Sequence, residues 1–228
     1  ERMVAILDEV SRSTGKRLLL PLEVLSRRDW ATHGPQGPYG IPGRLPSGGL
    51  GLPARADASV VKLWEGLLGN LPEIRHEPYH QDRREVASLE VIDALGAVSA
   101  ARILLEEAGF KADQHWVEEI LAHAEAEVGE NANGDEPAVL SVFAAFSTPS
   151  KPLFLAAFAN GLSYRDWLAY QQLFHRAADV LVSEAGPRGL RKLIRHGTAG
   201  NELQAKRDLL TAYPSVARVL SGAREAPK

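Results

Sequence analysis

The segment from Glu85 to Gly109 (EVASLEVIDALGAVSAARILLEEAG) constrains the fold more than any other part of the chain. It has the length of about seven helical turns, contains no proline, and has an internal glycine only at Gly96. A helix that is apolar on all sides leaves no face for water, so we predict a buried central helix. Its apolar residues include Val86, Leu89, Val91, Ile92, Leu95, Val98, Ile103 and Leu104.

Two acidic residues, Glu90 and Asp93, interrupt this apolar helix one turn apart. The same side of the helix continues into Ala94, Ala97 and Ala101. Carboxylates on a buried helix are costly unless they are paired or hydrated. This side of the helix, acidic at one end and lined with alanine at the other, is therefore the first place to look for a functional site.

The composition is that of an ordinary globular protein and excludes several functional classes. The chain of 228 residues is long enough for a sizeable core, and its net charge of -3 gives no electrostatic reason to expect a nucleic acid partner. No apolar run approaches the roughly 18 residues that span a bilayer, so we expect no transmembrane segment and a soluble protein. The absence of cysteine excludes disulfides, thiolate metal ligands and cysteine nucleophiles. The chain begins at Glu1 and not at methionine. If a signal segment precedes this residue, we expect an exported protein.

The N-terminal part carries the strand signals. Residues 3–13 have helical spacing, whereas residues 17–25 (RLLLPLEVL) are typical of a strand in which Pro21 favours an edge position. Ser26 is a helix N-cap with Asp29 at the third helical position.

The glycine- and proline-rich stretch 33–57 predicts two short strands joined by a turn around residues 47–49. This stretch lacks a phosphate-loop motif, so we interpret it as a hairpin.

The rest of the chain has helical patterns. The expected helices cover residues 59–68, 85–109, 114–128, 138–146, 152–159, 164–186, 187–197, 202–212 and 214–220. Gly129 is interpreted as the stop of the helix before it, and Gly186-Pro187 as the end of the long late helix. We therefore predict an α+β fold in one domain, 1–228, with a β-containing N-terminal subdomain (1–75) and a helical subdomain (76–228).

Residues 76–80 (HEPYH) match the zinc-binding string H-E-x-x-H letter for letter. That motif works only on a helix, where both imidazoles face one zinc ion. Pro78 fits only the first turn of a helix, which would leave His76 outside the helix and away from His80. We interpret the string as a chance match in a loop, with His76 and His80 as weak candidates for metal ligands.

A second pattern lies further along the chain. Residues 116–122 (WVEEILA) match W-x-x-E-x-x-A, and Leu95-Gly96 fits the L-G of H-E-L-G-H in the helix before it. Over roughly residues 17–220 the chain resembles the gluzincin (peptidase MA-like) zinc metallopeptidases. The resemblance implies a zincin-like fold, with a small mixed sheet whose edge strand lines the cleft, and it gives Glu119 the place of the third zinc ligand.

The same resemblance places Asp93 at the first histidine, Ala94 at the general-base glutamate and Ala97 at the second histidine. Catalytic zinc needs three protein ligands and a base for its water, and alanine supplies neither. We therefore expect no catalytic residues, no zinc or other cofactor, and an inactive peptidase-like domain that binds a protein or peptide in its cleft. The alternative is a metal-dependent hydrolase whose site combines Asp93 and Glu119 with His76 or His80.

Several residues keep two interpretations. Glu90, Asp93 and Glu119 form either a functional cluster, as a divalent-cation site or an acid/base pair with a raised pKa, or a structural one. In the structural interpretation, which we favour, they cap loops or pair with Arg102, Arg165 or Arg176. His123 is either a metal partner of Glu119 or, as we prefer, a histidine on an exposed helix face. Tyr170 and His175 lie where this family often places an oxyanion-stabilising residue, although packing explains their spacing. Trp30, Trp64 and Trp116 are expected in the core.

Overall fold

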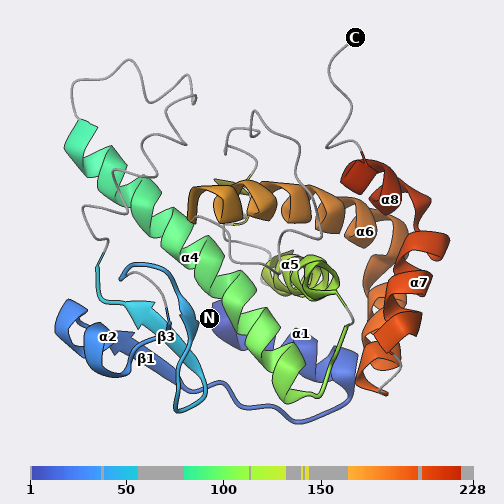
Figure 1. The fold of residues 1–228 in the computed structure, drawn as a ribbon, viewed down its shortest axis with the longest axis horizontal. Helices are drawn as coiled ribbons and strands as arrows, with labels where there is room; N and C mark the ends of the chain where they lie inside the picture. The colour runs from blue at the N-terminus through green and yellow to red at the C-terminus, as the bar shows by residue number, and fades with distance from the viewer. Residues whose placement is uncertain are drawn as a thin grey trace.

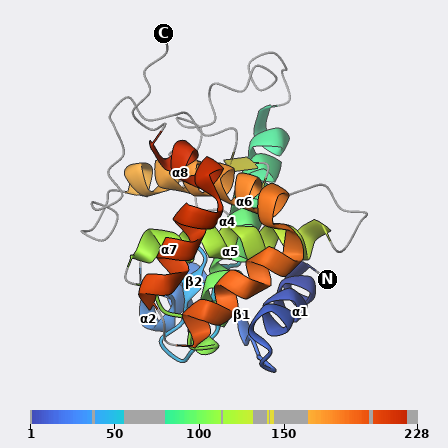
Figure 2. The ribbon, with the colours of Figure 1, turned by 90° about the vertical axis from the view of Figure 1, so that its right-hand side faces the viewer.

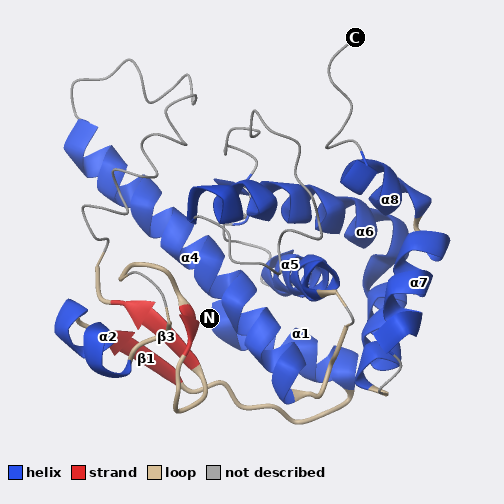
Figure 3. Ribbon diagram, in the orientation of Figure 1, coloured by secondary structure: helices blue, strands red, loops and turns tan. Residues whose placement is uncertain are grey.

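We describe the chain from a computed structural model, which describes residues 2–36, 39–55, 80–112, 114–131, 140, 142–143, 164–199 and 202–221. A small sheet near the N-terminus is followed by a larger set of helices (Figure 3). This arrangement confirms the predicted mixture of a small sheet with a mainly helical remainder. In chain order the elements are α1 (Arg2–Thr14), β1 (Leu22–Leu25), α2 (Arg27–His33), β2 (Gly43–Arg44), β3 (Leu50–Pro53), α4 (His80–Glu107), α5 (His115–Asn131), α6 (Tyr164–Thr198), α7 (Glu202–Ala212) and α8 (Pro214–Ser221).

The described sheet has three strands in the order β1-β3-β2, and it is mixed as predicted. β1 pairs with β3 in parallel, whereas β2 pairs with β3 in antiparallel orientation across the predicted turn. Gly48 and Gly49 have φ angles of 87° and 84° in that turn, a conformation that glycine adopts without strain. β1 lies at the edge of the sheet, as predicted, and begins directly after Pro21. Proline lacks the backbone N–H that pairing within a sheet uses, so it is tolerated at the edge or the start of a strand.

A small apolar cluster joins α2 to the sheet. Ser26 caps α2 as predicted, since its hydroxyl accepts a hydrogen bond from the Asp29 amide at 3.2 Å. Trp30 then packs with Leu25 and Leu45, and its ring meets Tyr39 edge-on at 5.4 Å. The predicted core position of Trp30 is confirmed.

The main core surrounds α5, which Figure 1 views almost along its axis, with α1, α4 and α6 around it. α4 is the predicted central helix, although it begins at His80 instead of residue 85. From Val91 to Leu105 nearly all of its side chains are buried, which confirms the inference from its all-round apolar pattern. Trp116 of α5 is also buried, whereas Trp64 and the predicted helices 59–68 and 152–159 lie outside the described residues.

α1 packs mainly with the helices. Ile6 and Val10 are fully buried in the main core, where α1 contacts α4, α5 and α6. Although α1 falls within the predicted N-terminal subdomain (1–75), it thus packs with helices of the predicted helical subdomain (76–228). α1 comes before the sheet in the chain, but its apolar residues are buried against three helices of the main core.

Gly129 is an interior residue of α5, so the prediction that it ends this helix is wrong. A Cβ at position 129 would lie 3.0 Å from the Ile6 Cα and 3.2 Å from the Ile6 amide nitrogen. Glycine is needed here because it lets the backbones of α1 and α5 approach closely.

α6 changes direction at Gly186, where φ is 59° and Pro187 follows. The predicted helix end at this point is thus confirmed as a kink between two helical halves. α7 and α8 pack beside α6 (Figure 2). No helix in the described part of the chain is both long and apolar enough to cross a membrane.

Gly129→Ala should lower the free energy of unfolding by about 1–3 kcal/mol, because its Cβ would press on the backbone of α1. Gly96→Ala is the matched control, since a Cβ there would meet side chains and no backbone: the ends of Leu52 and Met3 at 3.2 and 3.4 Å, and Pro42 at 3.9 Å. That control should change stability by less than about 1 kcal/mol. Denaturant unfolding of both variants measures the difference, and equal effects would contradict the close-approach explanation.

Candidate functional site

The positions that the resemblance aligns with the zinc-binding motif lie in very different surroundings. Ala94 and Ala97 are completely buried, whereas the Asp93 side chain is 60% exposed. Asp93 lies 3.6 Å from the guanidinium of Arg2, at the start of α1. Asp93 is thus both hydrated and paired, which resolves the cost expected for a carboxylate on this helix.

Glu119 is buried and forms an ion pair with Arg102 of α4. The Arg102 Nη1 atom donates a hydrogen bond to Glu119 Oε1 at 2.8 Å. The charge of Glu119 is the main reason that the pKa of Arg102 is raised above its ordinary value. The favoured interpretation of Glu119, pairing with an arginine, is confirmed for Arg102.

Asp93 and Glu119 belong to separate ion pairs, which lie at different positions along the packed helices α4 and α5. Arg2, which binds Asp93, also binds Glu130 in the last turns of α5, at 3.3 Å. Glu119 lies in the first turns of α5 and opposite Arg102, which is about 13 Å along α4 from Asp93. Within the described residues, no three His, Asp or Glu side chains form a group that can hold a metal ion.

The other candidate ligands of the predicted metal site lie wholly or partly outside the described residues. His76 lies outside the described residues. His80 and Glu90 lie on α4, but their side chains are outside the described part of the structure.

A polar seam runs between α5 and α6, which we define as His123 and Glu127 of α5 with Gln171, His175 and Asp179 of α6. His123 is fully buried, so the prediction of an exposed helix-face histidine is wrong. Its Nε2 atom lies 2.9 Å from Gln171 Oε1, and its ring centroid lies 6.1 Å from that of His175. Phe143 packs edge-on against His123, at 5.0 Å between ring centroids.

The seam changes the protonation of its residues because it excludes water. Burial lowers the pKa of His123 to about 3 and also lowers the pKa of His175. Burial raises the pKa of Glu127 to about 7, and the charge of Asp179 adds to this increase. At neutral pH both imidazoles are therefore neutral, whereas Glu127 exchanges a proton near pH 7.

Sequence reasoning did not identify the seam, although a signal was present. On each helix a histidine precedes a carboxylate by one turn: His123 and Glu127 on α5, His175 and Asp179 on α6. Residues four apart share a helix face, so this spacing places each pair on one side of its helix. Tyr170, the other late-helix candidate, lies in the core with its ring centroid 5.9 Å from that of Phe174.

The chain matches no protein-family model, no curated protein and no solved structure. The gluzincin resemblance therefore depends on the residues quoted above and on the order of the elements. Strongly shifted pKa values are typical of functional sites, and they also occur in structural ion pairs and buried seams.

Arg102→Met should lower the free energy of unfolding by about 3 kcal/mol or more, because it leaves the buried Glu119 carboxylate without its cation. The double variant Arg102→Met/Glu119→Leu should recover most of this loss. Arg44→Met is the control: its pairs with Glu106 and Glu107 are exposed, and their loss should cost less than about 1 kcal/mol. A double variant as unstable as Arg102→Met alone would contradict the pairing.

His123→Gln should remove a dependence of stability on pH. The folded protein keeps His123 neutral down to about pH 3, whereas the unfolded chain protonates it below about 6.5. The wild-type protein therefore loses about 1.4 kcal/mol per pH unit through this residue as the pH falls between these values. Denaturant unfolding of both proteins from pH 7 to pH 4 checks the difference, and parallel curves would rule out the assignment.

Proposed function

We propose that this chain is a catalytically inactive relative of the gluzincin metallopeptidases that acts by binding a protein or peptide. The observation that carries the proposal is the Arg102–Glu119 ion pair. The carboxylate in the place of the third zinc ligand is bound by a guanidinium, which supplies the positive charge that a metal ion would otherwise bring.

The other motif-equivalent positions support the same proposal. A catalytic zinc ion needs two further ligands and a base that removes a proton from its water. Ala94 and Ala97 have no donor atom, and both are buried away from solvent. Asp93 is held by Arg2 at another level of the helix pair.

The arrangement of the elements agrees with the resemblance. A small mixed sheet precedes α4, and α4 packs directly on α5, which carries the W-x-x-E pattern. Leu52 of β3 approaches α4 at Gly96, between Ala94 and Ala97. The sheet thus lies beside the stretch of α4 that the resemblance aligns with this family's zinc-binding histidines.

Elemental analysis of protein purified without chelator tests the proposal. We expect no stoichiometric zinc or other transition metal, and no metal-dependent cleavage of a peptide library. About one equivalent of metal that is lost in Asp93→Ala or Glu119→Ala would favour the alternative, a metal-dependent hydrolase. Arg102→Met is an informative comparison, because metal uptake only after this substitution would show that the guanidinium occupies the place of the ion.

A further inference from the structure

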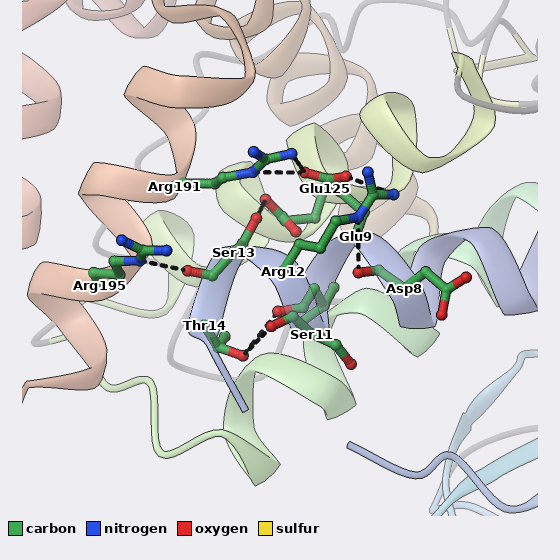
Figure 4. A network of polar contacts seen from close by, with 10 residues as sticks. Asp8, Glu9, Ser11, Arg12, Ser13, Thr14, Glu125, Arg191 and Arg195 are labelled. Carbon is green, nitrogen blue, oxygen red and sulfur yellow. Dashed lines mark hydrogen bonds and ion pairs between the residues drawn. The ribbon is translucent and has the colours of Figure 1, made fainter. Parts of the chain in front are cut away.

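A second buried polar network joins α1 to α5 and α6, and Figure 4 shows its members. Glu125 of α5 is completely buried, and the Ser13 hydroxyl of α1 donates a hydrogen bond to its Oε1 atom at 2.8 Å. The Oε2 atom of Glu125 is also buried, and it has no hydrogen-bond partner among the described residues. A carboxylate in this position is poorly compensated, because one hydroxyl donor does not replace the water it has lost.

The arginines of this network are bound by a different carboxylate. Arg191 of α6 donates to Glu9 Oε1 at 3.0 and 3.3 Å, and Arg12 lies 3.0 Å from Glu9 Oε2. Glu9 is itself buried on α1, so it uses both guanidinium groups at this interface. Glu125 therefore lies beside a second negative charge whose cations are already engaged.

This environment favours the neutral form of Glu125. Burial raises the pKa of Glu125 to about 8, and the charge of Glu9 acts in the same direction. The Ser13 hydrogen bond and the charges of Arg191 and Arg12 oppose this increase. These groups come from both helices that close over the carboxyl group, α1 and α6.

α1 covers this carboxyl group and excludes water from it. Ile6 and Val10 bury the apolar side of α1, and Arg195 of α6 donates to the Ser13 carbonyl at 3.3 Å. Ionised Glu125 regains its hydration when α1 moves away from α5. We propose that α1 is a pH-gated element, which is docked on α5 and α6 while Glu125 holds a proton and is released as Glu125 ionises.

The direction of the effect follows from proton linkage. The docked state binds the Glu125 proton more tightly than the released state, where a hydrated glutamate has its ordinary value of 4.5. Docking therefore weakens as the pH rises from 4.5 to about 8, and it changes little above that value. Between pH 6 and pH 8 the docking equilibrium constant falls about fifty-fold.

Hydrogen exchange of backbone amides in the full chain tests this gate. Protection factors, corrected for the intrinsic exchange rate, are compared for α1 (residues 6–13) and the buried part of α4 (residues 98–105). We expect α1 to be less protected than α4 at every pH, since its release leaves α4 folded. Protection of α1 should fall about fifty-fold between pH 6 and pH 8.

Two variants separate the proton gate from a purely structural role. Glu125→Gln keeps a neutral group of the same size, so α1 protection should become independent of pH in this range. Ser13→Ala removes a donor that lowers the docked pKa of Glu125, so the decline should start at the same pH and continue to a higher one. Equal protection of α1 and α4, no decline in the wild-type protein, or a decline that persists in Glu125→Gln would each overturn the proposal.

Discussion

The burial of α5 on all sides is the constraint on which the rest of the structure depends. α1, α4 and α6 cover this helix, and only a few of its side chains reach solvent. Its sequence is nevertheless rich in glutamate and also contains His123. Each buried polar group must therefore find its compensation within the protein, because no water is available to supply it.

The chain meets this requirement in three different ways. Glu119 remains in contact with a cation, the guanidinium of Arg102. His123 stays neutral and lies within hydrogen-bond distance of the Gln171 side chain. Glu125 keeps its proton and accepts a hydrogen bond from Ser13. These partners come from α4, α6 and α1 respectively, so the polar residues of α5 select which surfaces pack against each of its sides.

Local patterns in the sequence predicted the features that depend on neighbouring residues. The all-round apolar pattern identified α4, Ser26 identified the start of α2, and Gly186-Pro187 identified the kink in α6. Gly129 was misinterpreted because its reason for being glycine is the backbone of Ile6, far away in the chain. His123 was placed on the surface because nothing in α5 itself reveals that α6 covers it. The separation of Asp93 from Glu119 likewise depends on how α4 and α5 are aligned, which spacing along one helix does not determine.

The kink at Gly186 allows one continuous segment to serve two neighbours. The half of α6 before it carries His175 against α5, and the half after it carries Arg191 and Arg195 to α1. If α6 were straight, both halves would share one axis, and the second half would not reach α1 while the first half packs on α5. The positive φ of Gly186 therefore sets the angle between the two halves of α6, and with it the direction from which the second half contacts α1. A Cβ at position 186 would meet no atom within 4 Å, so a substituted side chain would act on this bend through backbone strain and not through crowding.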